Sequence, residues 1–372
     1  MPSTTSPQPP ATPVAPVAPL RSLLPVQPEF PLPPSPGFPL PLQPAPAPPR
    51  PPGFPLPHTG PWLAADLAAR LGSSRAPARL VAQGLLVRIS WGVYYSAPHW
   101  EVLPARERHL ALMAAHHAMH ARHGQPRFVY SHLSAARLHG LELWEPDELV
   151  HVTGCEPVAA KRRRGDARIH GSEVPPEQRT VVEGLPATSL ERTVLDSARI
   201  LRPGQAQIVV DHGLRLGARK RLLERMVDEA PGGRGIVTAR RAVELGSALS
   251  ESAGESLLNM VVAGMPVPRP QQQIEVVTRY GVHRIDSGWP SIRRGLELDG
   301  KKKYFEYAPT EEVVFKERQR EKLLMEDEWR FLRLEWKDVF RPDELQRRIE
   351  RLIASAGPAG IAMLEEARCA GR

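Results

Sequence analysis

The residues best suited to chemistry lie between Arg284 and Tyr304, in the stretch RIDSGWPSIRRGLELDGKKKY. Side chains alternate along its two strand-like runs, so Asp286 lies on one face of the first run, and Glu297 and Asp299 share a face of the second. If the runs pair as a hairpin, the three carboxylates converge. Clustered carboxylates repel one another unless they share a cation or a proton, and hard divalent cations prefer oxygen ligands. The stretch therefore predicts a site for a divalent cation.

A plainer interpretation gives these acidic side chains a structural role. Arg284, Arg293 and Arg294 lie in the same stretch, and the carboxylates would then only complete a charged hairpin beside them. The sequence leaves both interpretations open.

Length and charge limit the number of domains and the class of partner that we expect. The 372 residues leave room for two or three domains with a sizeable core. The formal charge is +8, and the excess lies in residues 61–250, where Lys and Arg outnumber Asp and Glu by 26 to 19. A basic middle favours a polyanionic partner such as DNA, although a general preference for Arg gives the same excess.

Cysteine use and hydropathy indicate the compartment. Cys155 and Cys369 belong to no paired motif, which argues against a disulfide framework or a zinc knuckle and for a reducing cytoplasm. We find no run of about 18 apolar residues and no basic-then-apolar signal pattern at the N-terminus. We therefore expect a cytoplasmic protein without a membrane partner.

Residues 1–60 stand apart by composition. They hold 23 of the 42 prolines, and each proline removes a backbone donor and fixes φ. We expect a disordered tail rich in polyproline II. A passive spacer is the favoured role, and docking to an aromatic groove or a misplaced start codon are the alternatives.

Residues 61–98 predict a winged helix-turn-helix. Leu63, Leu67 and Leu71 recur at helical spacing in WLAADLAARLG and predict a helix from Trp62 that ends at Gly72. Ser73 or Ser74 can cap a second helix that ends at Gly84. The runs LLVRI and VYY then flank a turn that contains glycine, which is typical of a hairpin.

The second helix predicts a DNA-binding face. Arg75, Arg79 and Gln83 are spaced at i, i+4 and i+8, so they form one polar stripe, and Arg88 lies on the wing that follows. Arg and Gln in such a stripe reach phosphates and base edges in a major groove. The alternative is an ordinary solvated helix face.

A second basic segment is a loop formed by Lys161, Arg162, Arg163 and Arg164. Four adjacent like charges repel one another, so the loop must be exposed. It either contacts phosphates or is simply solvated.

The helix predicted over residues 104–123 carries His116, His120 and His123 on one face. Their spacing is compatible with a metal, but no nearby carboxylate or cysteine completes a site. We expect ordinary histidines here.

Residues 62–215 resemble the AbiEi-like antitoxins of bacterial type IV toxin–antitoxin systems. The similarity lies in the short helix pair, the wing GLLVRISWGVYY and the segment YSHLSAARLHGL at Tyr130–Leu141. The resemblance implies a module that binds operator DNA and represses its own operon, with a cognate toxin as protein partner. It also implies a structural role for His132. The chain departs from the pattern in having proline-rich sequence where a leading helix is usual.

The residues after Ser250 resemble the PD-(D/E)XK nuclease superfamily, in particular its very-short-patch-repair-like branch. The predicted order is helix, three strands, helix, strand and helix, with a strand at Gln271–Thr278, a long helix over residues 310–326 and a closing helix at Pro342–Ala354. The matching pieces are IDSGWP, ELDGKKKY, KERQREKLL and FLRLEWKDV. The resemblance implies that Glu255, Asp286, Glu297 and Asp299 bind Mg²⁺, which would polarise a phosphate and activate a water.

The basic residue of this motif is displaced. The superfamily's lysine lies two residues after the motif glutamate, where this chain has Asp299, and the branch's histidine position holds Lys303. Lys301 or Lys303 would have to supply the positive charge. Lys301 shares the parity of Glu297 if the strand continues through Gly300.

Together these patterns predict a mixed α/β (α+β) chain. We expect the following parts: a disordered tail (1–60), a winged helix-turn-helix (61–98), a middle α+β domain with a helical bridge (99–250), a restriction-endonuclease-like α/β domain (251–354) and a C-terminal tail (355–372). The predicted function is a DNA-binding regulator of the antitoxin type with a nuclease-like domain. An active Mg²⁺-dependent DNA endonuclease and a toxin-neutralising scaffold are the alternatives, and the oligomeric state stays open.

Overall fold

The computed structural model describes most of the chain after residue 60. The described residues are 56, 60–121, 124, 126–154, 162–164, 167–230, 232–278, 281–299, 324 and 326–370, with the backbone alone at 162–164 and 299. Within them the chain is a mixed α/β protein with three sheets and twelve α-helices. The proline-rich segment lies almost wholly outside the described residues, as do Cys155 and the helix predicted over residues 310–326.

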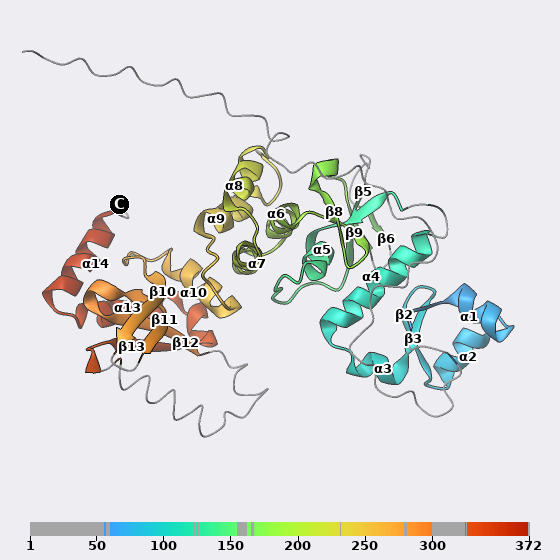
Figure 1. Ribbon diagram of the computed structural model, residues 1–372, viewed down its shortest axis with the longest axis horizontal. Coiled ribbons are helices and arrows are strands. Elements are labelled where there is room, and N and C mark those ends of the chain that lie inside the picture. Colours follow the sequence, from blue (N-terminus) through green and yellow to red (C-terminus); the bar gives the residue numbers. More distant parts are fainter. Residues whose placement is uncertain are drawn as a thin grey trace, which may run out of the picture.

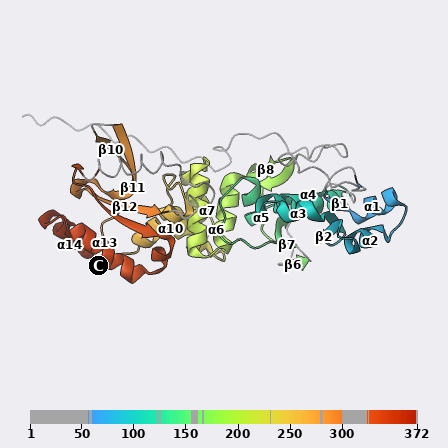
Figure 2. The ribbon, with the colours of Figure 1, turned by 90° about the horizontal axis from the view of Figure 1, so that it is seen from below.

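The parts follow one another along an elongated body (Figure 1). The first sheet and its two helices lie at one end, the last sheet lies at the other end, and helices α6 to α9 stand between them (Figure 2). None of the helices in the described part of the chain is long and apolar enough to cross a membrane.

The N-terminal unit packs two short helices on a three-stranded antiparallel sheet of order β1-β3-β2. Its elements are β1 (Trp62–Leu63), α1 (Ala64–Leu71), α2 (Ala76–Ala82), β2 (Leu86–Ser90), β3 (Val93–Ser96) and α3 (Ala97–Val102). Leu67, Leu80 and Leu86 fill its core. The predicted helix pair and hairpin are confirmed, and Gly72 ends α1 at φ 64°.

Two local predictions in this unit are wrong. Trp62 does not begin the first helix, because Trp62 and Leu63 pair with Tyr94 and Val93 as β1. The N-cap of α2 is Arg75 and not a serine. The Ser73 hydroxyl instead accepts the backbone N–H of Arg75 at 3.3 Å.

The middle sheet has six strands in the order β6-β7-β5-β4-β9-β8, with parallel pairs β5–β7 and β4–β9. Its strands and the helices packed on it are α4 (Ala105–Ala121), β4 (Phe128–Tyr130), α5 (His132–Leu138), β5 (Val150–Gly154), β6 (Arg162–Arg164), β7 (Ala167–His170), β8 (Arg179–Val182) and β9 (Leu185–Thr188). Apolar side chains of α4 and α5 pack on β4, β5 and β9. The predicted basic loop is wrong in part: residues 162–164 form edge strand β6, because they pair with β7 as an antiparallel hairpin.

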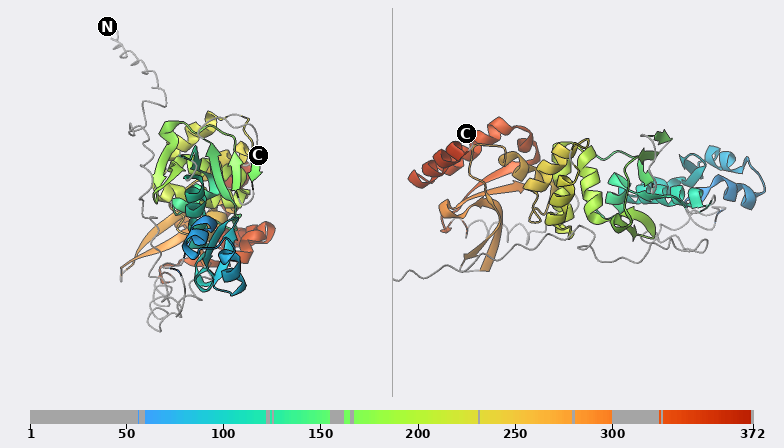
Figure 3. Two further views of the ribbon diagram at one scale, coloured as in Figure 1. Left: turned by 90° about the vertical axis from the view of Figure 1, so that its right-hand side faces the viewer. Right: turned by 90° about the horizontal axis from the view of Figure 1, so that it is seen from above.

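A four-helix layer follows the middle sheet (Figure 3). It consists of α6 (Leu190–Ile200), α7 (Pro203–Arg215), α8 (Lys220–Asp228) and α9 (Ile236–Leu245). Ser189 caps α6 by accepting the backbone N–H of Arg192. Arg192 and Asp196, both on α6, form a buried ion pair at 2.7 Å. The Arg192 guanidinium also donates to Gln178 at 2.6 Å, directly before β8, and so links α6 to the segment that leads into the sheet.

The C-terminal sheet has four strands in the order β10-β11-β12-β13, and only β12 and β13 are parallel among these described strands. The elements are α10 (Ala253–Val262), β10 (Gln271–Thr278), β11 (Gly281–Trp289), β12 (Arg294–Asp299), β13 (Arg330–Glu335), α13 (Pro342–Ala354) and α14 (Pro358–Ala370). Side chains of α10 and α13 form one core with β11 to β13. The predicted tail after residue 354 is wrong, because Leu364 is buried in this core and α14 packs on α13.

The four-helix layer and the C-terminal part share apolar contacts. Ile208 of α7 is 1% exposed and belongs to the C-terminal core. Gly204 lies so close to α10 that an added Cβ would stand 2.7 Å from Leu257 Cδ2. The ring of Trp144 meets that of Trp336 edge-on at 5.6 Å. These contacts fix the C-terminal sheet against the middle of the chain.

Candidate functional site

Asp286 and Glu297 lie where strands β11 and β12 stop pairing. The last recorded pair is Ser287 with Leu296, so Asp286 and Glu297 are the next residues on the two strands. The Asp286 carboxylate turns to the partner strand, where the backbone N–H of Leu298 donates to Oδ2 at 3.4 Å. The predicted pairing of the two runs is therefore observed, and the convergence of their carboxylates stays a prediction.

Helix α10 brings Glu255 to the same edge. A Cβ added at Gly254 would lie 2.1 Å from Leu298 Cδ2, so the absence of a side chain there lets the helix approach β12 closely. Ser252 caps the helix by accepting the backbone N–H of Glu255 at 3.2 Å. We call Glu255, Asp286 and Glu297 the carboxylate edge.

The surroundings of Glu255 act on its pKa in opposite directions. Burial is the largest effect and raises its pKa, and the negative charge of Asp286 adds to the rise. Hydrogen bonds from the Glu251 backbone N–H at 3.0 Å and the Ser252 hydroxyl at 2.8 Å act the other way. Gln273 also donates to Glu255, at 3.2 Å. The net effect favours a proton or a cation on Glu255.

Glu297 has a basic neighbour on β13. Parallel pairing places Arg333 beside it, with Arg333 Nε 3.6 Å from Glu297 Oε2. The three arginines considered in the plainer interpretation have other recorded partners: Arg284 pairs with Glu251 at 2.7 Å and Arg293 with Glu328 at 3.1 Å. Arg294 donates to the Ser355 carbonyl at 2.9 Å.

The carboxylate edge is not a closed metal cage. Among the residues that the structure describes, only one group places three ligand atoms within 4.8 Å of one another, and it consists of histidines. The backbone of Asp299 lies on β12 opposite Glu335. The Asp299 side chain, Lys301 and Lys303 lie outside the described part of the chain. Coordination of Mg²⁺ thus stays a prediction.

The predicted DNA-binding side chains of the N-terminal unit lie at the surface. Arg75, Arg79, Gln83 and Arg88 are all exposed. Arg88 Nε donates to the Ser90 carbonyl at 3.2 Å, which holds the guanidinium along β2. Trp91, at the hairpin tip, is 80% exposed. Lys161 and the side chains of Arg162, Arg163 and Arg164 lie outside the described residues.

The histidines predicted on α4 make protein contacts. His116 Nδ1 lies 3.2 Å from the Tyr130 hydroxyl, and the His120 ring nitrogen lies 2.8 Å from the His116 carbonyl. Burial, with the neighbouring His120 and His117, lowers the pKa of His116 to about 3. His123 lies outside the described residues.

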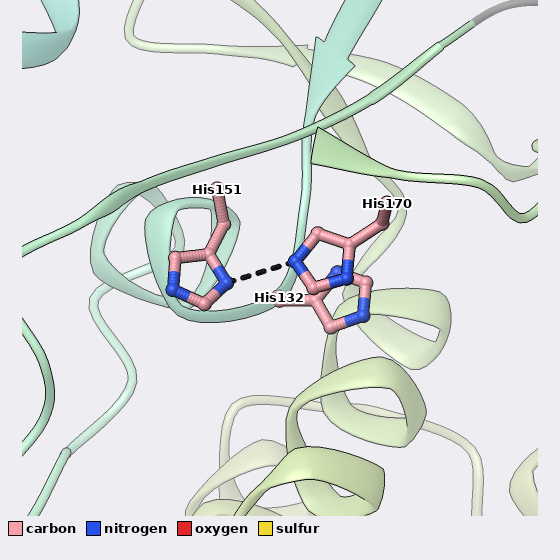
Figure 4. A group of neighbouring side chains, drawn as sticks. All are labelled: His132, His151 and His170. Atoms are coloured by element: carbon pink, nitrogen blue, oxygen red, sulfur yellow. Dashed lines mark hydrogen bonds between the residues drawn. The ribbon is translucent and has the colours of Figure 1, made fainter. Parts of the chain in front are cut away.

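A second cluster was missed by sequence reasoning. His132, His151 and His170, which we call the histidine trio, gather between α5, β5 and β7 (Figure 4). His151 and Arg168 are paired residues of parallel strands, so His170, two residues after Arg168, shares the face of His151. The available signal was the pair of short strand patterns HVTG and ARIH. Their parallel pairing is non-local and could not be read from them.

The comparisons with known proteins identify relatives without a stated activity. A comparison with protein-family models found no match. Two similar proteins are "Uncharacterized protein MT2308" of Mycobacterium tuberculosis strain CDC 1551 / Oshkosh and "Uncharacterized protein Rv2248" of strain ATCC 25618 / H37Rv. Each is 30% identical over 182 residues, which cover 48% of this chain and 66% of the relative.

A solved structure gives only a weak likeness. The crystal structure of the RV2827C protein from Mycobacterium tuberculosis aligns with a TM-score of 0.33 and 17% identity, over 57% of this chain and 82% of that one. A likeness at this level carries no argument about fold or function.

Proposed function

We propose that this chain is a DNA-binding regulator, similar to the AbiEi-like antitoxins, that contacts DNA through α2 and the β2–β3 hairpin. The observation that carries the proposal is the exposed face of α2. Arg75 and Gln83 cap α2 and Arg79 lies on it, and all three are exposed, while Ala76, Pro77 and Leu80 are buried. Such a helix presents its polar stripe outward, in the way that a recognition helix enters a major groove.

The charge of the N-terminal unit supports this use. Residues 61–98 carry four arginines and a single acidic residue, Asp66, which lies on α1. No acidic residue is therefore present on α2 or on the hairpin to oppose phosphates. Electrostatic attraction to phosphates supplies most of the sequence-independent affinity for DNA.

The hairpin offers a second contact beside α2. The sheet order β1-β3-β2 puts β2 at an edge of the sheet, with Arg88 exposed on it. The exposed Trp91 ring stands at the tip. Some DNA-binding proteins insert apolar side chains into the minor groove, and we propose that Trp91 makes such a contact beside α2.

The test is salt-dependent binding to DNA. Fluorescence anisotropy of a labelled duplex from upstream of the chain's own coding sequence is measured between 50 and 200 mM salt. Loss of two phosphate contacts in Arg75→Gln/Arg79→Gln should reduce the slope of log K against log salt by about 1.8. Arg221→Gln, an exposed arginine on α8, is the matched control and should leave the slope unchanged. An unchanged slope in the double variant would refute this role of α2.

A second candidate function is Mg²⁺-dependent cleavage of DNA at the carboxylate edge. The observation that favours it is the raised pKa of Glu255, to which the charge of Asp286 contributes, because such a pair is suited to sharing a cation. Plasmid nicking is compared between the unaltered chain and Asp286→Asn, with Mg²⁺ or Mn²⁺. Equal nicking by both would exclude this activity and would leave the DNA-binding proposal untouched.

A further inference from the structure

The histidine trio lies in the middle sheet, on elements that neither α2 nor the carboxylate edge includes. His132 is the first residue of α5, His151 lies in β5, and His170 is the last residue of β7. His151 Nδ1 is 3.0 Å from His170 Nε2, and the His132 and His170 rings stack with centroids 3.5 Å apart (Figure 4). One nitrogen from each ring lies within 4.8 Å of the others.

We propose that His132, His151 and His170 bind a transition-metal ion of the Zn²⁺ class. Imidazole nitrogens suit Zn²⁺, Ni²⁺ and Cu²⁺, whereas Mg²⁺ prefers oxygen ligands. The site is thus chemically distinct from the carboxylate edge. Three protein ligands leave the fourth position of a tetrahedral ion for a water or another small ligand.

The hydrogen-bond partners of two rings leave the correct nitrogens for a metal. Asp147 Oδ1 lies 2.9 Å from His151 Nε2, so the carboxylate accepts that N–H and the lone pair of Nδ1 faces His170. Ser131 Oγ lies 2.9 Å from His132 Nδ1 and also accepts from Thr153 at 2.7 Å. A metal-binding histidine commonly donates its other N–H to such a partner, which fixes the ring and raises its basicity.

Two of the three proposed ligands are shielded from solvent. His132 and His151 are 5% and 0% exposed, so the elements packed around them hold both rings in place.

The backbone at His132 is held in an unusual conformation. Its φ is 49°, in the left-handed region that a side chain disfavours. Such a conformation costs about 1–3 kcal/mol and persists only where the surroundings impose it, most often at functional sites. Here it directs the His132 ring against His170 at the start of α5.

Binding requires a small rearrangement. Two nitrogens that hold one tetrahedral Zn²⁺ at about 2.0–2.1 Å lie about 3.3 Å apart, so the 3.0 Å contact between His151 and His170 must open slightly. Lone pairs lie in the ring plane, so one of the stacked rings must also turn. His170 is only half-buried and ends its strand, which gives it the freedom to turn.

The test is a zinc titration of the chelator-treated full chain by calorimetry, together with the absorption spectrum of its Co²⁺ form. We expect one ion per trio, a tetrahedral Co²⁺ spectrum and at least tenfold weaker binding in His170→Gln. Asp147→Asn should weaken binding about 10- to 100-fold, because it removes the partner of a ligand without removing the ligand. His120→Gln, an exposed histidine on α4, is the matched control and should bind as the unaltered chain does.

The outcomes separate a metal site from a structural cluster. Far-UV circular dichroism first confirms that each variant is folded. If the unaltered chain, His170→Gln and Asp147→Asn bind Zn²⁺ equally, or if none binds it at micromolar concentration, the proposal is overturned. The trio would then be a hydrogen-bonded chain from Asp147 through His151 to His170 that only stabilises the middle sheet.

Discussion

Acid should destabilise the middle part of the chain, because two histidines of α4, which packs on the middle sheet, are held in neutral form. Burial and the charge of Arg137 lower the pKa of His109 to about 3, and burial with neighbouring histidines lowers that of His116 to about 3. Arg137 Nη1 donates to His109 Nε2 at 3.2 Å, so protonation would also break this contact.

The sign follows from the two pKa values. In the unfolded chain a histidine has a pKa near 6.5. Between that pH and about 3 the histidine is therefore protonated in the unfolded state and neutral in the folded state. The stabilising effect is complete above pH 6.5 and is lost as the pH falls from 6.5 towards 3. At pH 5 the cost is about 2 kcal/mol for each histidine, and about 4 kcal/mol for both. A domain with a stability of about 5–15 kcal/mol loses a large part of it.

Hydrogen-exchange mass spectrometry of peptides from α4 and α5, corrected for the pH dependence of intrinsic exchange, measures this loss between pH 7 and 4.5. His109→Gln keeps an acceptor for Arg137 and removes the titrating group, so its stability should depend less on pH. Arg106→Gln, exposed on the same helix, should behave as the unaltered chain. Equal protection of α4 and α5 at pH 7 and pH 5 would refute the reasoning.

Three further predictions concern single side chains. The pKa of Glu255 is raised in the folded chain, so ionisation of its carboxyl lowers the free energy of unfolding as the pH rises through the folded pKa. Glu255→Gln removes this loss, and its free energy of unfolding in urea should rise relative to that of the unaltered chain from about pH 4.3 upward. Asp196→Ala leaves the buried Arg192 uncompensated and should cost about 3–5 kcal/mol, whereas Arg192→Met/Asp196→Ala should recover much of this; equal losses would contradict the assignment. Gly254→Ala should cost about 1–3 kcal/mol by forcing α10 from β12, and Leu298→Ala in the same chain should relieve the clash; a thermal melt that Gly254→Ala leaves unchanged would count against this close approach.

Local patterns predicted much of the fold. The helical spacing of leucines and the glycines that follow predicted α1 and α2 as helices. β10 and α13 have the predicted bounds, Gln271–Thr278 and Pro342–Ala354. The predictions are wrong where contacts with residues distant in the sequence determine the conformation of a segment. Trp62–Leu63 is a strand because β3 pairs with it, and residues 358–370 form a helix because α13 and the C-terminal core offer an apolar face.

The candidate site shows the same division. Alternation placed Asp286 and Glu297 on neighbouring strands, and the register of β11 and β12 agrees. The approach of Glu255 depends on Gly254 fitting against Leu298, which no spacing in the sequence reveals. The histidine trio depends on the parallel pairing of β5 with β7, whose residues are 17 positions apart, and on the turn that begins α5.

The contact of α7 with the C-terminal core decides where the chain can be cut. The composition suggests a boundary near Ser250, yet Ile208 lies before it and is packed among residues that come after it. The ring of Trp144 also meets that of Trp336, and Asn259 of α10 donates to the Ser250 hydroxyl at 3.3 Å. A fragment that ends at residue 250 would expose Ile208 and Trp144 to water. A fragment that begins there would expose the residues of the C-terminal core that pack against these two side chains. We therefore expect the helical layer and the last sheet to unfold as one cooperative unit, and expression of either alone to yield an aggregation-prone fragment.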